Sequence, residues 1–227
     1  MSDAIALRDL PTEQWPTREL ILREASRLFA ARGYLGTSTR EIAAAVGIQQ
    51  PSLYNHFASK QAIAEALLDY DLETGLAFMR PLLEEEGSAA ERLYRYVLFE
   101  VTHCTSSPYD LRALYLSELL EQPEFARGRA MLEEYDSNLR KLIELGIESG
   151  EFVDIDPGFA HAAVDAIVID TMRRATRHRS NWSEHADCAA SFLLRGLLRR
   201  PAALRGISAR AHRDFERRRL PGEIESA

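Results

Sequence analysis

Six polar side chains lie close together in a segment whose other residues are regularly spaced and apolar. They are Gln49, Gln50, Ser52, Tyr54, Asn55 and His56. The amides of Gln and Asn donate and accept in one plane, which matches the major-groove edge of adenine. Tyr and His are suited to phosphate oxygens, whose contacts set register without reading sequence. Pro51 offers an apolar surface to a thymine methyl group. The residue types therefore indicate hydrogen-bonded recognition of a duplex.

Two short helices must position this cluster, and the first has a clear start signal. Ser38 and Glu41 form a capping box, in which the Ser38 hydroxyl accepts from the Glu41 amide and the Glu41 carboxylate reaches back. The sequence therefore predicts a helix that begins at Thr39 and stops at Gly47.

The second helix is predicted to begin at Gln50 or Pro51, because proline is favoured in the first turn, and to end by about Phe57. At two turns it cannot be stable alone, so its neighbours must hold it. Five apolar residues are expected to fix the crossing of the two helices: Ile42, Val46, Ile48, Leu53 and Phe57. Two short helices joined by a tight glycine turn are a helix-turn-helix signature, whose second helix enters the major groove.

The segments "LFAARGYLGTSTREIAAAVGI" and "SLYNHFASKQAIAEALL" make the chain similar to the N-terminal domain of the TetR family of bacterial transcriptional repressors, over residues 17–68. The positions that match the family's recurrent residues are Gly33, Tyr34, Thr37, Thr39, Ile42, Ala43, Val46, Gly47, Leu53, Tyr54, His56, Phe57, Ser59 and Lys60. The chain departs from the pattern at Gln49, where a serine cap is frequent, and at Pro51, where a small residue is common.

The resemblance implies nine or more helices, a homodimer and a ligand cavity in the C-terminal domain. It also implies that Thr39 and Arg40 face phosphate at a helix N-terminus. Lys60 would do the same from the start of the next long helix, where free amides attract an anion.

Charge is distributed unevenly along the 227 residues, whose net charge is −7. Residues 1–60 carry +1, residues 61–194 carry −13 and residues 195–220 carry +7. The middle of the chain would repel a polyanion, so a nucleic acid is expected to meet only the first sixty residues or the tail. Two cysteines without a CxxC pattern, and no signal peptide or bilayer-length apolar run, favour a soluble cytoplasmic protein that does not contact the membrane.

Helical periodicity recurs throughout the chain and predicts an all-α protein of about nine or ten helices. The expected domains are a flexible arm (1–15), a three-helix helix-turn-helix DNA-binding domain (16–62), a larger ligand-binding and dimerisation domain (63–200) and a basic tail (201–227). The tail keeps helical spacing, and we interpret it as a partly ordered, solvated helix. A helix packed on the acidic body, or one that touches DNA or RNA, is the alternative.

Long helices are predicted for residues 60–79, 89–105, 124–148, 159–178 and 183–199, with another marked by apolar residues at 111–120. The last pair alternates small and large apolar residues, which would let it form a four-helix bundle with a second copy of the chain. The alternative is a purely intramolecular core.

A helical, mostly apolar cavity suits a small hydrophobic or amphipathic ligand. The candidate polar anchors are Tyr96, Glu100, His103, Tyr115, Asp165 and Asp170. Asp170 could instead pair with Arg174. We expect no cofactor and no metal, since the spacing supplies no third ligand for His161 and Asp165, or for His185 and Cys188.

These patterns together predict a DNA-binding repressor that binds a palindromic operator as a dimer and is released by a ligand. An enzyme is disfavoured, because no GxSxG, P-loop or dense His/Cys/acid constellation is present. The remaining alternative is a ligand-binding helical adaptor that does not bind an operator.

Overall fold

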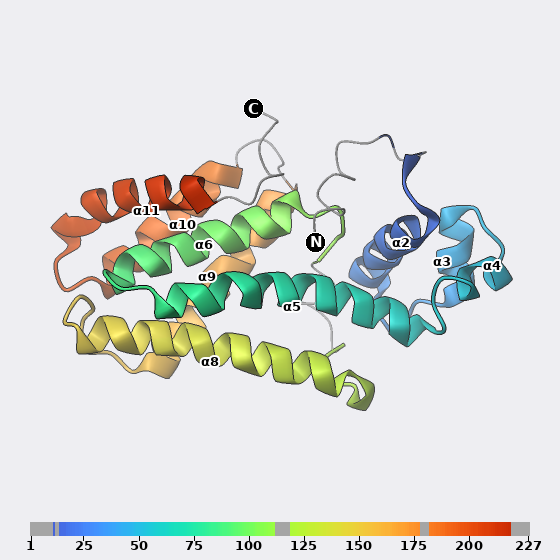
Figure 1. Cartoon of the computed structure of the whole chain (residues 1–227), viewed down its shortest axis with the longest axis horizontal. Helices are drawn as coiled ribbons and strands as arrows, with labels where there is room; N and C mark the ends of the chain where they lie inside the picture. The colour runs from blue at the N-terminus through green and yellow to red at the C-terminus, as the bar shows by residue number, and fades with distance from the viewer. Residues whose placement is uncertain (1–10, 12–13, 112–118, 178–181, 219–227) are drawn as a thin grey trace. The chain divides into compact units, whose positions relative to one another are not determined.

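The computed structural model describes residue 11 and residues 14–111, 119–177 and 182–218, and its regular elements in these ranges are helices joined by turns and loops (Figure 1). The helices are α2 (Thr17–Arg32), α3 (Thr39–Val46), α4 (Gln50–Tyr54), α5 (Lys60–Glu84), α6 (Ala89–Ser106), α8 (Ala126–Glu148), α9 (Pro157–Arg177), α10 (Trp182–Leu197) and α11 (Leu204–Arg218). Within the described ranges the only β-type pairing is an isolated bridge between Phe152 and Leu198. The predicted all-α class is confirmed, whereas the helix expected around 111–120 lies mostly outside the described residues.

The chain divides into two compact units. Unit 1 combines residues 1–74 with 107–132, and unit 2 combines residues 75–106 with 133–227. The division falls inside α5 and α8, so each of these helices contributes residues to both units. Unit 1 is therefore larger than the expected domain of residues 16–62.

A single apolar core holds the three short helices of unit 1. Ile21 of α2, Ile42 of α3 and Leu53 of α4 are fully buried in it, and Val46 and Ile48 pack against its edge. The core also contains residues of α5 and of the segment before α8, including Phe125. The apolar residues predicted to fix the helix crossing therefore do meet one another.

Local signals at the ends of α3 behave as the sequence predicts. The Ser38 hydroxyl accepts from the Glu41 amide at 3.2 Å, and the Glu41 carboxylate accepts from the Ser38 amide at 2.9 Å. These bonds with Ser38 lower the pKa of Glu41. Gly47 ends the helix in the left-handed conformation with φ 78°, which glycine adopts without steric cost.

Two helix ends differ from the prediction. α4 ends at Tyr54 rather than near Phe57, and the amides of Asn55 and His56 bond to the carbonyl oxygens three residues back, those of Ser52 and Leu53, at 3.3 and 2.9 Å. α5 continues beyond Met79 to Glu84, passing through Pro81. Met79 and Leu82 are both buried, so packing on either side of Pro81 offsets the backbone hydrogen bond that proline removes.

Lys60, the first residue of α5, fastens the connection between α2 and α3. Its ammonium donates to the carbonyl oxygens of Tyr34 and Thr37, at 2.7 and 2.8 Å. It also lies 4.2 Å from the centre of the Tyr34 ring, a cation–π contact. Partial burial lowers the pKa of the Lys60 ammonium, with the Glu124 carboxylate opposing that shift. Tyr34 in turn packs edge-on against Phe29 and Phe125.

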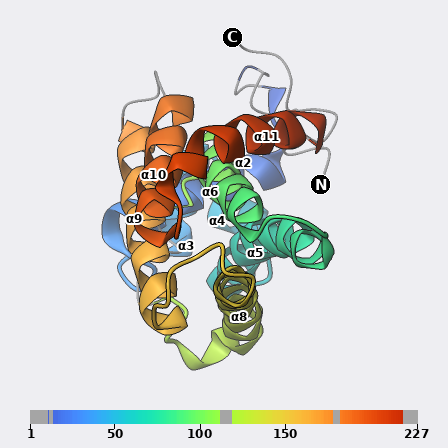
Figure 2. The ribbon, with the colours of Figure 1, turned by 90° about the vertical axis from the view of Figure 1, so that its left-hand side faces the viewer.

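Unit 2 is built around α6, which packs against α9, α10 and α11. Figure 2 shows α9 and α10 side by side, with α11 crossing α6. Glu151 caps the start of α6, where its carboxylate accepts from the amides of Ala89 and Ala90 at 2.8 and 3.3 Å.

The basic tail is more ordered than the solvated helix that the sequence suggested. In α11, Leu204, Ile207 and Ala211 are buried, and the Arg210 guanidinium pairs with Glu91 of α6 at 2.5 Å. For residues 204–218 the structure agrees with the packed-helix alternative, because apolar residues that keep helical spacing in the tail are buried and α11 packs on α6.

The Lys60 contacts predict a specific loss of stability in unit 1. Lys60→Met keeps the apolar stem but leaves two carbonyl groups without their donor, which should lower the free energy of unfolding by about 1–3 kcal/mol. Trp15 is buried in unit 1, so its fluorescence during urea unfolding, in a Trp182→Phe background, reports on this unit.

The matched control is Arg40→Met, which removes another long cation of unit 1. The Arg40 side chain is exposed, and a surface substitution should change the free energy by no more than about 0.5 kcal/mol. An unfolding midpoint of Lys60→Met equal to that of Arg40→Met would contradict the structural role of Lys60.

Candidate nucleic-acid interface

The side of α4 opposite its buried anchor is exposed and polar. Leu53 is 0% exposed and points into the core of unit 1, which fixes how α4 is rotated about its axis. The residues left on the outer side are Gln49, Pro51, Ser52, Tyr54, Asn55 and His56, all of them exposed. The predicted recognition residues are thus brought together on one accessible surface by a single buried side chain.

Gln50 differs from its neighbours because its side-chain amide already makes hydrogen bonds within the protein. Its Nε2 donates to the Thr39 Oγ1 at 3.0 Å and to the Tyr54 hydroxyl at 3.4 Å, and the two hydroxyls are 3.2 Å apart. The bonds from Thr39 and then Gln50 lower the pKa of Tyr54. This triangle ties the start of α3 to α4 and holds three polar groups in fixed positions.

The N-terminus of α3 adds positive potential to the same surface. Arg40 occupies the first turn of α3 and its side chain is exposed. Among the described residues it makes no ion pair, whereas Arg18, Arg23, Arg27 and Arg32 all pair with glutamates. Free amides and an unpaired guanidinium at one helix end are suited to an anion.

Lys60 was also predicted to contact phosphate, but its ammonium is directed at groups within the protein. Its ammonium is directed at the Tyr34 and Thr37 carbonyl oxygens and at the Tyr34 ring. Sequence reasoning placed Lys60 correctly at a helix N-terminus, but it could not foresee that a preceding turn would present two carbonyl acceptors to it.

The predicted ligand anchors of unit 2 separate into two groups. Tyr96 and Glu100 are buried in α6, and the negative charges of Glu100 and Asp165 act on the Tyr96 hydroxyl, whose pKa is raised well above its ordinary value mainly by burial. His103 is buried and stacks on Phe99, and Asp170 pairs with Arg173 and Arg174 on the surface. Tyr115 lies outside the described residues.

Two further polar residues of unit 2 lie near Tyr96 and were missed. The Tyr135 hydroxyl donates to the Glu100 carboxylate, and Asp136 adds its charge to those acting on Tyr96. Both belong to α8, which has no local sequence signal at these positions, so only tertiary packing brings them to α6.

No helix in the described part of the chain is long and apolar enough to cross a membrane.

Comparisons with known proteins match both units. A family model for "Bacterial regulatory proteins, tetR family" matches residues 21–67, and one for "Tetracyclin repressor-like, C-terminal domain" matches residues 86–173. The transcriptional repressor KstR2 of Mycobacterium tuberculosis is 30% identical over 145 residues, which are 60% of this chain and 70% of that protein.

Solved structures have the same fold. AmtR of Mycobacterium smegmatis superposes with a TM-score of 0.70 at 31% identity, over 88% of this chain and 97% of that one. AibR, solved with isovaleryl coenzyme A and operator DNA, gives a TM-score of 0.65 at 22% identity, over 79% of this chain and 98% of that one.

The helix-turn-helix of unit 1, its exposed polar surface and the agreement with these models and relatives lead to one conclusion: the chain belongs to the TetR family of bacterial regulatory proteins and is a DNA-binding transcriptional regulator.

Proposed function

We propose that the protein is a cytoplasmic repressor that binds a palindromic operator as a homodimer and is released by a small hydrophobic or amphipathic ligand. It would act by binding, without turnover of the ligand. The observation that carries the proposal is the exposed polar side of α4, which is oriented by the buried Leu53 and adjoins the cationic N-terminus of α3.

The side chains on this surface divide by chemistry into base readers and phosphate contacts. Gln49, Ser52 and Asn55 have short polar side chains that are exposed and suited to base edges, with Pro51 available to a thymine methyl group. Thr39, Arg40, Tyr54 and His56 are suited to phosphate oxygens, which set the register of the protein on the duplex. The contacts of Gln50 with Thr39 and Tyr54 favour a shared role in which it orients those hydroxyls and presents its remaining amide oxygen.

Lys60 has a different part in this proposal. Because its ammonium is used by two backbone carbonyl oxygens, it would position the α2–α3 connection rather than neutralise a phosphate. Arg40 is then the principal cation of the phosphate-binding set in each protomer.

The proposed dimer uses the outer faces of α9 and α10. Phe159 is 67% exposed and Phe192 is 66% exposed, which is unusual for side chains that bury so much apolar area. Four other exposed positions on these helices are small, Ala162 and Ala166 on α9 and Cys188 and Gly196 on α10, whereas Arg173 and Arg195 are exposed and charged. Large and small residues on a self-complementary face favour close packing against a second copy across a two-fold axis.

The proposed effector site lies in unit 2, where Tyr96, Glu100 and Asp165 are the polar anchors that the geometry favours. They act on one another electrostatically inside the helical body, whereas Asp170 is already paired with two arginines. KstR2 is a repressor, and AibR was solved with both a coenzyme A thioester and operator DNA, which supports a ligand-responsive mechanism in this fold. A coupling of about 1–3 kcal/mol between ligand and operator would change operator affinity about 5–150-fold.

The direct test is selection of DNA from a random duplex pool by the purified full chain at low salt. The proposal predicts an enriched palindrome whose half-sites are about 34–36 Å apart, one helical turn, or a multiple of that. Apolar metabolites would then be screened for release of the selected duplex. Failure to enrich any DNA, together with a stable complex with another protein, would favour the adaptor alternative.

Asn55→Ala tests base reading. If Asn55 reads a base, the variant should lose about 1–3 kcal/mol of affinity for the selected operator and much less for random duplex. Fluorescence anisotropy on both duplexes measures the two losses. Equal losses on the two duplexes would remove Asn55 from the set of base readers.

Arg40→Ala is the matched control for a residue that binds phosphate. It should weaken binding to both duplexes alike, and reduce the slope of log affinity against log salt concentration by about 0.9 for each phosphate that the variant no longer neutralises. A preserved slope would show that Arg40 does not neutralise a phosphate.

Phe192→Arg tests the dimer. Burying a charge in place of an aromatic anchor should cost about 2–4 kcal/mol, which weakens self-association roughly 30- to 1000-fold. Sedimentation equilibrium measures the effect. Leu35→Arg is the control, because Leu35 is 69% exposed but lies in unit 1. A wild-type monomer, or a Phe192→Arg variant that associates as tightly as Leu35→Arg, would contradict the proposed interface.

A further inference from the structure

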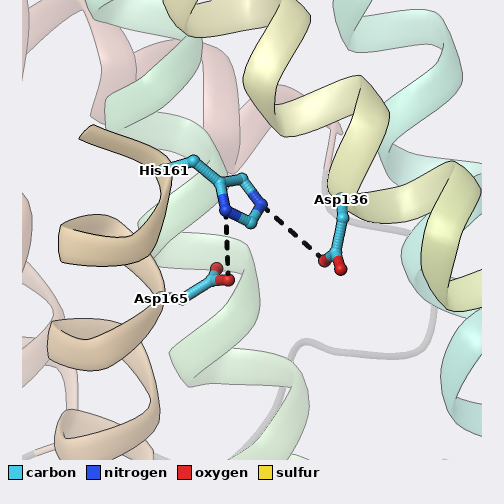
Figure 3. Close-up of side chains that lie close together, drawn as sticks. All are labelled: Asp136, His161 and Asp165. Carbon is cyan, nitrogen blue, oxygen red and sulfur yellow. Dashed lines mark ion pairs between the residues drawn. The ribbon is translucent and has the colours of Figure 1, made fainter. Parts of the chain in front are cut away.

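Unit 2 contains a convergence of one imidazole and two carboxylates from two different helices. His161 and Asp165 lie one turn apart on α9, and Asp136 approaches them from α8 (Figure 3). One ligand atom from each residue can be chosen so that all three lie within 4.8 Å of one another. Asp136 is the third group that the sequence spacing alone did not supply for His161 and Asp165.

The contacts inside this cluster are not those of a satisfied ion pair. The His161 Nδ1 lies 3.6 Å from Asp165, and the His161 Nε2 lies 3.8 Å from Asp136. Both separations exceed ordinary hydrogen-bond lengths of about 2.7–3.2 Å. The Nε2 atom is buried and makes no hydrogen bond among the described residues, and the His161 side chain as a whole is only 10% exposed. A buried ring nitrogen without a partner is costly unless something else occupies the space in front of it.

The three side chains bring two carboxylates to one imidazole. Both carboxylates are only partly exposed, 40% for the Asp136 side chain and 34% for the Asp165 side chain. The Tyr96 hydroxyl lies close enough to interact electrostatically with Asp136 and Asp165, and it adds no positive charge. Two partly buried carboxylates beside a single imidazole would be stabilised by a divalent ion.

We propose that Asp136, His161 and Asp165 bind a divalent transition-metal ion, with Zn²⁺ the best fit and Mn²⁺ a weaker one. An imidazole together with carboxylates is a donor set for such ions, whereas Mg²⁺ and Ca²⁺ prefer oxygen ligands alone. Around an ion with bonds of about 2.0–2.2 Å, neighbouring ligand atoms lie roughly 3–4 Å apart, so short side-chain rotations would complete the site. Three protein ligands leave a further position open to water or to a ligand.

This site would connect α8 to α9 within unit 2. Asp165 is also one of the proposed effector anchors, but metal binding is measured without effector or DNA, so failure of this inference is distinguishable from failure of the proposed function.

The test is equilibrium dialysis of the full chain, treated with EDTA, against Zn²⁺ and separately against Mg²⁺. The wild-type protein should bind one Zn²⁺ per chain and should not bind Mg²⁺ at the same concentration. Asp136→Asn, His161→Gln and Asp165→Asn should each weaken Zn²⁺ binding at least about tenfold, since even replacement of groups that only orient ligands costs about 10–100-fold.

Two controls separate this cluster from other zinc-binding groups. Asp170→Asn removes a carboxylate from the same helix α9, and Cys188→Ser removes an exposed thiol near His185. Both variants should bind Zn²⁺ as the wild type does. The absence of stoichiometric binding to the wild type, or loss of binding in Cys188→Ser with retention in Asp136→Asn, would overturn the proposal.

The change in unfolding temperature on addition of Zn²⁺ distinguishes loss of the metal site from a general folding defect. Zn²⁺ should raise the unfolding temperature of the wild type and of Asp170→Asn, because an ion that binds only the folded state stabilises it. The same addition should leave Asp136→Asn unchanged, while its far-UV circular dichroism without metal stays that of the wild type. An equal rise in Asp136→Asn would also overturn the assignment.

Discussion

A helix of five residues cannot persist in water by its own hydrogen bonds, and α4 is such a helix. Its existence depends on the burial of Leu53 against Ile42 and the core of unit 1. That one contact fixes the position of α4 and also its rotation, so it decides which side chains face outward. The recognition surface is therefore a consequence of core packing, and it is as rigid as that core.

Several weaker interactions keep the surface in place once Leu53 is buried. The capping box of Ser38 and Glu41 sets the start of α3, and the Gln50 amide ties that start to Tyr54. Lys60 stabilises the turn before α3 by donating hydrogen bonds to the carbonyl oxygens of Tyr34 and Thr37. The Glu41, Gln50 and Lys60 side chains in these contacts are long, and ordering each costs up to about 2 kcal/mol of rotamer freedom, which the hydrogen bonds must offset. In the described part of the chain, Arg40 is the long cation without an ion pair at this end of α3, and its exposed guanidinium is suited to an anion outside the protein.

Much of unit 1 could be predicted from sequence because its signals are local. The capping box, the left-handed glycine at 47 and the apolar spacing from Ile42 to Leu53 each act over a few residues. Signals that depend on distant partners could not be predicted in the same way. Lys60 was assigned to phosphate from its place at a helix start, and its hydrogen bonds to the Tyr34 and Thr37 carbonyl oxygens depend on a turn far from it in the sequence. Asp136 likewise gives no local signal, because only α9 brings His161 beside it. The helix past Pro81 and the packed face of α11 have the same origin, since burial of Leu82 and Ile207 outweighs what the local sequence suggests.

Site-specific photo-crosslinking to a bound duplex tests most directly whether α4 is the surface that meets DNA. A photoreactive residue would replace exposed Ser52 on α4 in one protein, and exposed Arg213 on the basic helix α11 in another. The account predicts that position 52 crosslinks to bases in both half-sites of a selected operator and that position 213 does not crosslink. Crosslinks from position 213 with none from position 52 would contradict it and would transfer the DNA-binding role to α11.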